Sequence, residues 1–323
     1  MLPRALLALP TVLLAALGPA ATASAAVVPA TSAGTVLRAI VTFDGSTETI
    51  DLALTVPAGE GRIGLVFPTP SRAEVTATDA DAFAALDATI APQSIVEDDW
   101  WGREQPETAT EPTEPSATGE ASQSSIRGSD SGSLRSWLKQ NDLELSDDTD
   151  DTIDDYVGAG WALALVAFDA PATTSELAVA RLSFTTDEAV FPLALFSDAS
   201  SPLTMRFYVA ADGRTVLHED TTAGRDINAA QSVVWAGTLA GTEVADLGDY
   251  LTVTDVYVTA PEDQLSDDLR FDAAAADDEV IPAETVYRRI ELLGLPAGWL
   301  LTAWGAIGLV LGVSWLGYRA RRR

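Results

Sequence analysis

The chain has 323 residues, of which 48 are acidic and 19 basic, with one histidine and no cysteine. The net charge of −29 at pH 7 argues against nucleic acid and anionic lipid headgroups as partners, because binding to either depends on Lys and Arg side chains that neutralise phosphate. The lack of cysteine excludes cysteine nucleophiles and disulfides, and with a single histidine it leaves too few ligands for a zinc site.

Residues 1–26 have the pattern of a secretory signal peptide. Arg4 precedes an apolar run over 5–17, and small residues lead to Ala-Ser-Ala at 23–25, which has the form of a signal-peptidase site. We expect cleavage after residue 25 or 26, with a retained signal anchor as the alternative. Five of the 19 basic residues lie in the signal peptide and the C-terminal tail. The rest of the chain therefore carries 14 basic and 48 acidic residues, a charge of −34.

The N-terminal part of the expected ectodomain, 27–103, is rich in predicted strands. Alternating apolar and polar residues predict strands over 35–43 and 47–56, and Asp44-Gly45 between them predicts a tight antiparallel hairpin. A more continuously apolar run over 62–67 predicts a central strand that Pro68 ends. Helical spacing over 79–90 predicts a short amphipathic helix.

Composition changes over 104–133, which is rich in Pro, Thr, Ser, Glu and Gly and has almost no large apolar residue. Such a segment cannot bury enough apolar surface to offset the entropy of ordering it, so we predict a disordered linker, with a surface excursion as the alternative.

The C-terminal part of the ectodomain, 134–274, begins with short helices at 134–138 and 152–157. Strands are predicted over 161–168, 177–185, 189–196, 203–211, 214–218, 232–235 and 251–258. The pattern indicates an α+β fold, with a mostly antiparallel sheet of four or five strands, helices on one side of it, and a few short helices in all.

An acidic stalk over 275–291 is predicted to precede a transmembrane helix over 292–318. This run carries no charge and exceeds the roughly 20 apolar residues that cross a bilayer. The basic tail 319–323 follows, so we expect a single-pass protein in the cell membrane with its N-terminus outside and its C-terminus cytoplasmic. The predicted membrane-anchor residues are Trp299, Trp304, Trp315, Tyr318, Arg319, Arg321, Arg322 and Arg323.

Eight segments, in this order and spacing, resemble a known bacterial family. They are VFPTP at 66–70, DAFAAL at 81–86, WW at 100–101, LRSWL at 134–138, YVGAGW at 156–161, LSFTTDEAVFPL at 182–193, YLT at 250–252 and DDLRF at 267–271. Over about 35–278 the chain is similar to domain of unknown function 2330. The resemblance implies an exported, often membrane-anchored protein and no catalytic residue. Members carry cysteines just after the signal peptide, whereas this chain has none.

Candidate chemical groups are few, so we predict no catalytic, cofactor-binding or metal site. His218 is the sole histidine, and adjacent carboxylates such as Asp98 and Asp99 arise freely among 48 acidic residues. The acidic run 146–155 lacks the glycine of an EF-hand and is interpreted as a helix start, although the acidic surface is expected to bind calcium weakly. Trp100 and Trp101 are the candidate partner contacts, with core packing as the alternative.

These observations favour a non-enzymatic cell-surface module that binds an envelope or membrane protein, with membrane lipid contacted through the C-terminal helix. One alternative is an envelope hydrolase that uses carboxylates or a serine with His218. Another is an accessory subunit that packs in the bilayer through a small-residue face of the helix, Gly305, Gly308 and Gly312.

Overall fold

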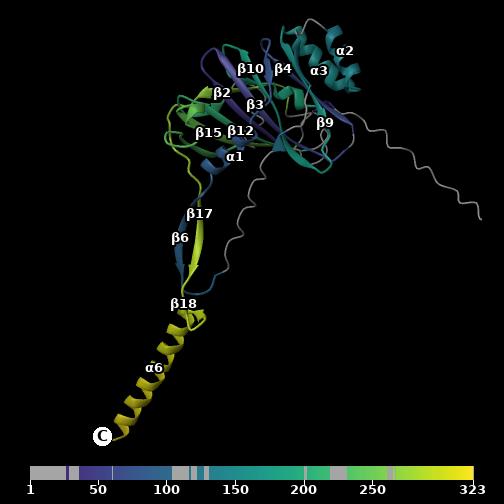
Figure 1. Cartoon of the computed structure of the whole chain (residues 1–323). Coiled ribbons are helices and arrows are strands. Elements are labelled where there is room, and N and C mark those ends of the chain that lie inside the picture. Colours follow the sequence, from purple (N-terminus) through teal and green to yellow (C-terminus); the bar gives the residue numbers. More distant parts are fainter. Residues whose placement is uncertain are drawn as a thin grey trace, which may run out of the picture.

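The computed structural model describes residues 27–28, 36–59, 61–103, 116–117, 122–126, 131–199, 202–218, 231–259, 265 and 267–322. The predicted signal peptide and most of the predicted linker lie outside these residues. Three parts follow one another in space: a β-rich head, a two-stranded stalk and the C-terminal helix α6 (Ala297–Arg321) (Figure 1). The head comprises the described residues other than 93–103 and 282–322.

The largest sheet of the head is mostly antiparallel and contains the predicted hairpin. Asp44 Oδ1 accepts hydrogen bonds from the backbone N–H groups of Ser46 and Thr47 at 2.9 and 2.8 Å, and Gly45 takes the positive φ, +91°, that the turn needs. In sheet order the strands are β14 (Gln231–Thr238), β15 (Tyr250–Val258), β12 (Leu203–Ala211), β2 (Val36–Phe43), β3 (Thr47–Val56), β10 (Ser175–Thr185) and β5 (Glu74–Thr76), with β7 (Ser116–Ala117) beside β10.

This sheet is wider than the four or five strands predicted, because strands from both parts of the ectodomain join it. β2 pairs with β12 in parallel, although they lie about 170 positions apart in the chain, and β3 pairs antiparallel with β10. The two parts therefore share one sheet.

A second, four-stranded sheet packs against the first. Its order is β1 (Val27–Val28), β4 (Arg62–Thr69), β9 (Ala162–Asp169) and β8 (Ser122–Ile126). A three-stranded sheet consists of β11 (Val190–Phe191), β16 (Leu269–Ala273) and β13 (Thr215–Leu217). β7 and β8 lie within 104–133, the predicted linker, and β8 pairs antiparallel with β9.

The main hydrophobic core joins residues of all three sheets. The rings of Phe67 and Phe191 lie 5.4 Å apart, those of Phe191 and Phe207 lie 5.0 Å apart, and all three side chains are fully buried. Helix α2 (Ser131–Gln140) packs on β4 through Trp137. At Gly64 a Cβ atom would meet the Leu143 side chain at 2.6 Å, so a larger residue there would require this side chain to move.

Helix α1 (Ala80–Thr89) covers a different face, through a second core cluster. Its residues Phe83 and Leu86 pack with Tyr208 and Leu251 of the large sheet. Helices therefore pack on two faces of the head, and the expectation of helices on one side is wrong because α1 and α2 bury their apolar stripes against different sheets.

One predicted strand, over 189–196, is mostly not a strand. Only β11 pairs, and the 3₁₀-helix η1 (Leu193–Phe196) follows Pro192. Proline has no N–H to donate to a ladder, so pairing ends there. A second 3₁₀-helix, η2 (Ala245–Leu247), lies before β15.

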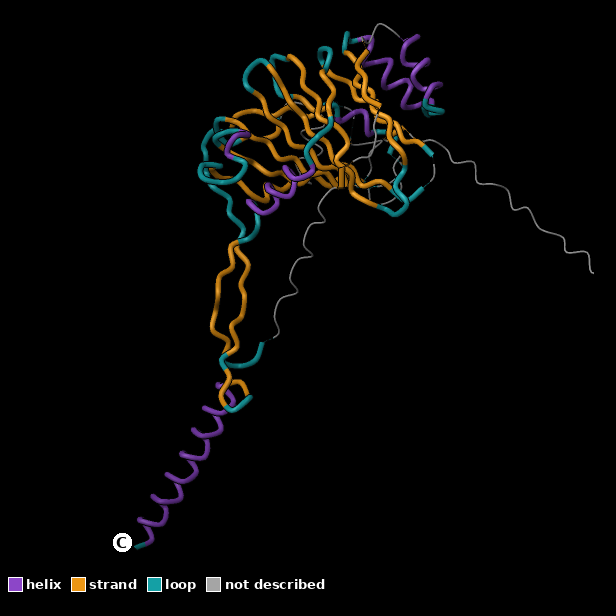
Figure 2. The backbone as a smooth tube through the Cα atoms, in the orientation of Figure 1, coloured by secondary structure: helices purple, strands orange, loops and turns teal. Residues whose placement is uncertain are grey.

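The stalk consists of β6 (Gln93–Asp99) and β17 (Ala283–Arg289), paired in parallel from Ala283 opposite Gln93 to Arg289 opposite Asp99. Figure 2 shows this pair running from the head to α6. The acidic composition predicted a stalk over 275–291 but not its partner strand, because that partner lies 190 positions earlier in the chain.

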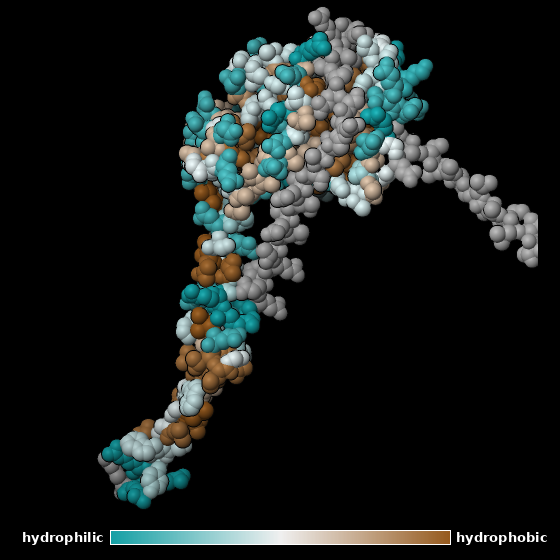
Figure 3. Space-filling view, in the orientation of Figure 1, coloured by the Kyte–Doolittle hydropathy of each residue, from teal (hydrophilic) through white to brown (hydrophobic). Residues whose placement is uncertain are grey.

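Helix α6 begins later than the predicted 292, because the chain first makes a tight turn. β18 (Glu291–Leu292) and β19 (Leu295–Pro296) pair around Leu293 and Gly294, whose φ angles are +56° and +75°. Among the described helices α6 is the one that could cross a membrane by length and composition. Figure 3 shows its apolar surface and hydrophilic end. A β-rich fold with mostly antiparallel sheets and a C-terminal apolar helix is thus confirmed.

Candidate functional site

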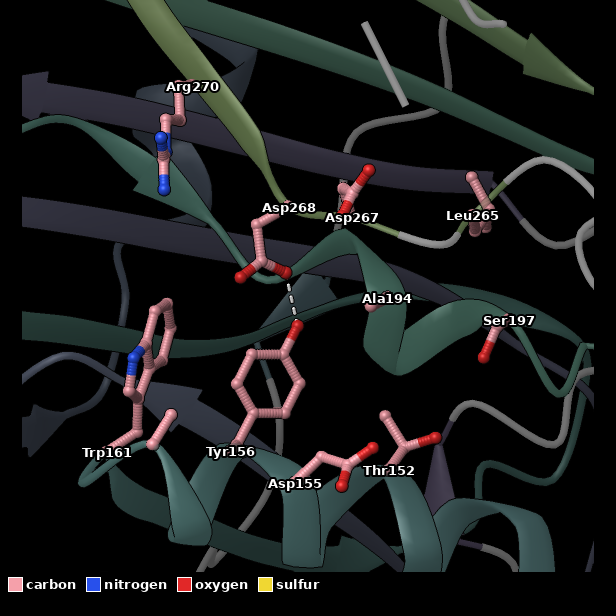
Figure 4. A pocket seen from close by; sticks show the side chains of 11 residues that line it. Thr152, Asp155, Tyr156, Trp161, Ala194, Ser197, Leu265, Asp267, Asp268 and Arg270 are labelled. Atoms are coloured by element: carbon pink, nitrogen blue, oxygen red, sulfur yellow. Dashed lines mark hydrogen bonds between the residues drawn. The ribbon is translucent and has the colours of Figure 1, made fainter. Parts of the chain in front are cut away.

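A pocket of about 570 Å³ opens in the head between α3 (Asp147–Gly158), η1 and the start of β16 (Figure 4). Its walls combine aromatic rings, carboxylates and hydroxyls. The lining residues are Thr152, Asp155, Tyr156, Ala159, Trp161, Ala194, Ser197, Leu265, Asp267, Asp268 and Arg270. Its volume is in the range of small-ligand sites, and its lining is more polar than is usual for them.

The local sequence explains why α3 forms one wall. Ser146 caps the helix, because its Oγ accepts a hydrogen bond from the Thr149 N–H at 3.1 Å. Three aspartates in the first turn favour this start through the helix dipole. The acidic run is therefore a helix start, as its sequence indicated. Ile153 and Tyr156 are buried, while Thr152 and Asp155 lie at the pocket.

A hydrogen bond between Tyr156 and Asp268 joins two walls of the pocket. The Tyr156 hydroxyl donates to Asp268 Oδ1, as Figure 4 shows. Burial raises the pKa of Asp268, and hydrogen bonds from Tyr156 and from the Ala194 N–H partly offset this effect. Burial also raises the pKa of Tyr156, so the phenol stays protonated and remains a donor. The bond joins α3 to the segment before β16.

The remaining lining groups suit a polar ligand with hydrogen-bond donors. The rings of Tyr156 and Trp161 lie 5.0 Å apart at 49° and give an aromatic wall. The positive charge of Arg270 is engaged by Glu188, whose Oε1 lies 3.2 Å from Arg270 Nε. The lining also contains three aspartates, Asp155, Asp267 and Asp268, so acidic groups outnumber the one basic group there. Within the described part of the chain, no group of three or more His, Cys, Asp or Glu side chains could hold a metal ion.

The candidate contacts Trp100 and Trp101 lie far from this pocket, where the stalk meets α6. The two residues are 43% and 52% exposed. Asp99, which is 3% exposed, accepts hydrogen bonds from the backbone N–H groups of Trp101 at 3.0 Å and Arg103 at 2.7 Å and so fixes the turn. Asp98 pairs with Arg288 at 2.6 Å. Both carboxylates of this pair thus have structural contacts.

His218 also lies outside the pocket, just after β13. Its Nδ1 contacts Asp272 Oδ2 on β16, so the structure supplies a carboxylate partner that the sequence did not indicate. The neighbouring Glu219 and Asp220 lie outside the described residues.

The comparison with known proteins decides the family. A family model described as "uncharacterized protein conserved in bacteria (DUF2330)" matches residues 18–272. The chain belongs to this family. The resemblance that the eight segments indicated is therefore confirmed. No curated protein matches the chain.

Two solved structures show a weak likeness to this DUF2330 chain. The crystal structure of baculovirus P35 has a TM-score of 0.36 and 8% identity, covering 77% of this chain and 96% of that one. A mutated baculovirus P35 after caspase cleavage has a TM-score of 0.30 and 11% identity, covering 78% and 99%. Scores this low support no conclusion about fold or function.

Two of the segments that indicated DUF2330 meet at the pocket. Residues 156–161 contribute Tyr156, Ala159 and Trp161, and residues 267–271 contribute Asp267, Asp268 and Arg270. Sequence reasoning did not assign these residues to a site, because 112 positions separate the partners Tyr156 and Asp268. The family segments contain six of these residues, but they did not mark them as a site.

The predicted anchor residues of this DUF2330 chain lie on α6 or at its end, apart from Arg323, which is outside the described residues. Trp299 is near the start of the helix. At the other end the guanidinium of Arg319 lies 5.0 Å from the Trp315 ring centre, and that of Arg322 lies 4.7 Å from the Tyr318 ring centre.

Proposed function

We propose that this chain is an exported, single-pass membrane protein whose head is a non-enzymatic binding module. The observation that carries the proposal is the order of its parts: an apolar helix, a narrow stalk, and a head whose pocket wall α3 lies at the end away from the stalk (Figure 1). Such an arrangement presents the pocket away from the bilayer, toward a partner protein or another envelope component.

The stalk has a physical role in this proposal. Each strand has seven residues, which at about 3.3 Å per residue gives a separation of about 23 Å. This exceeds the Debye length of about 8 Å at physiological ionic strength, so the acidic head is screened from anionic headgroups. Repulsion between the acidic head and the membrane is thereby weakened.

The orientation can be tested with single cysteines, because the natural chain has none. We expect Tyr257→Cys, at a half-exposed position on β15, to react with a membrane-impermeant maleimide on intact cells. We expect Arg322→Cys, at the end of α6, to react after permeabilisation alone, since arginines favour the cytoplasmic side. The reverse pattern, or equal labelling of both variants in intact cells, would contradict the orientation.

The pocket can be tested with a photo-crosslinking amino acid at Thr152, on its rim, in the membrane-bound full-length chain. We expect a specific adduct that disappears when Ala159→Trp fills the pocket. Ala159 is the exposed residue that ends α3, and its φ of −76° is open to any L-residue, so the backbone tolerates the larger side chain. A crosslinker at Tyr257 is the control. An adduct that persists in the Ala159→Trp variant would show that the partner binds elsewhere.

A further inference from the structure

The two tryptophans after β6 are joined to the start of α6 by hydrogen bonds. The Gly298 N–H donates to the Trp100 carbonyl oxygen at 2.6 Å, and Trp299 Nε1 donates to the Trp101 carbonyl oxygen at 3.0 Å. A Cβ atom on Gly298 would lie 2.8 Å from the Trp101 ring, so this glycine lets the ring pack directly on the helix. The Trp100-Trp101 turn and α6 are therefore one unit.

The length of α6 sets the level of this unit relative to a bilayer. A hydrocarbon core of about 30 Å corresponds to about 20 helical residues. Counting back about 20 residues from Arg319, the first charged residue of α6, reaches Trp299. If Arg319 lies at the inner boundary, Trp299 and the turn bonded to it lie at the outer boundary.

The neighbouring surface is apolar and uncovered. Leu293, at the tip of the β18–β19 turn, is 90% exposed, and Leu292 and Leu295 are each 53% exposed. Trp299 is 61% exposed. A gathering of exposed apolar groups such as this normally marks a contact with a membrane or a partner protein.

We infer that Trp100, Trp101, Trp299 and the Leu293 turn form an interfacial collar that sits in the outer headgroup layer of the bilayer. Indole rings favour this layer because their faces are apolar while their N–H groups still find polar partners. The occupant is lipid, because the surface is continuous with the membrane-crossing surface of α6. The chain then contacts the membrane through two segments, 100–101 and 292–318, and the stalk is fixed at its base by both.

This inference rests on the proposed insertion of α6, so the test measures both. Four single-cysteine variants of the full-length chain are spin-labelled: Trp100→Cys, Leu293→Cys, Val310→Cys within α6, and Tyr257→Cys on the head. Each is placed in phosphatidylcholine nanodiscs without any other protein. Electron paramagnetic resonance power saturation then reports accessibility to a water-soluble nickel chelate and to oxygen, which concentrates in lipid.

We expect the labels at positions 100 and 293 to be severalfold less accessible to nickel than the label at 257, and less buried in lipid than the label at 310. If the labels at positions 100 and 293 are as accessible to nickel as the label at 257, while the label at 310 is still protected, the collar is overturned. The α6 anchor then remains, and the tryptophans are available to a protein partner. A nickel-accessible label at 310 would overturn both the anchor and the collar. Position 293 gives an independent reading should the change at Trp100 disturb the turn.

Discussion

A Glu48→Gln variant is expected to unfold with a higher free energy than the wild type at pH 8, while the two chains differ little at pH 4. Glu48 lies on β3 with a fully buried side chain, and its two carboxylate oxygens accept from the Val190 N–H at 3.1 and 3.2 Å. Burial raises the pKa of Glu48 from 4.5 to about 8, and repulsion from Glu188 adds to the shift. The hydrogen bond from the Val190 N–H lowers this pKa and so offsets part of the effect of burial.

The sign follows from proton linkage. Between pH 4.5 and about 8 the folded chain keeps the Glu48 proton that the unfolded chain releases, so stability falls as pH rises through this window. At about 1.4 kcal/mol per pKa unit, the loss is on the order of 3 to 5 kcal/mol by pH 8. Glutamine is neutral at every pH and can still accept from the Val190 N–H, so the variant lacks this loss.

The measurement is urea unfolding of the detergent-solubilised chain at several pH values, followed by near-ultraviolet circular dichroism of the head. At each pH, the free energy of unfolding of the wild type is subtracted from that of the variant, which removes the contribution of the other titrating groups. Glu74→Gln, at an exposed position on strand β5, is the matched control for the same chemical change without burial. Parallel curves for Glu48→Gln and the wild type would contradict an uncharged Glu48 in the fold.

Replacing Arg38 by leucine is expected to destabilise the head by about 3 to 5 kcal/mol, because it leaves two largely enclosed carboxylates, Asp87 and Glu176, without their cation. Arg38 is 4% exposed on β2. Its Nη2 lies 2.6 Å from Asp87 Oδ2 and donates to the Tyr208 hydroxyl at 2.8 Å, and its Nη1 lies 3.3 Å from Glu176 Oε1. The network fastens α1, which carries Asp87, to the large sheet. Phe83 of the same helix lies under the guanidinium, with its ring centre 5.2 Å from Arg38 Cζ.

The control is Arg62→Leu, because Arg62 is 38% exposed and lies 4.0 Å from Asp169, which is 84% exposed. A pair of this kind is worth about 1 kcal/mol or less. The double variant Arg38→Leu/Asp87→Leu should cost less than the two single changes together, since it removes a charge with its partner. Equal losses in urea unfolding for Arg38→Leu and Arg62→Leu would show that the buried network contributes nothing beyond a surface pair.

Local sequence patterns predicted those elements that are stabilised by interactions between residues close together in the chain. Asp44 and Gly45 predicted the β2–β3 hairpin because the turn needs a positive φ and an acceptor for its free N–H groups, and both requirements are met within four residues. Asp79, which caps α1, acts in the same way, since its side chain accepts from the Asp81 N–H at 3.0 Å. The apolar length of α6 is likewise a property of consecutive residues.

Local sequence patterns did not predict the structure where it depends on a partner far away in the chain. Residues 93–99 are mostly polar and have no clear strand pattern of their own. They form a strand because their backbone groups pair with those of β17. The same pairing brings Trp100 and Trp101 to the base of the stalk, and no feature of the segment itself places them beside residue 298. In the pocket, Tyr156 has the spacing of a core residue of α3, and its hydroxyl gains its role from Asp268.

By itself the sequence determined the strand-rich class of this protein, the β2–β3 hairpin, the helix starts and the apolar C-terminal helix. Each depends on interactions between neighbours in the chain or on the composition of a continuous run. Tertiary structure alone decided the width of the large sheet, the two-stranded stalk, the pocket and the position of the two tryptophans. The physical reason is that strand pairing and burial depend on which distant segments meet. Period-two patterning predicts which face of a strand is apolar, but it does not predict which other strand will pair with it.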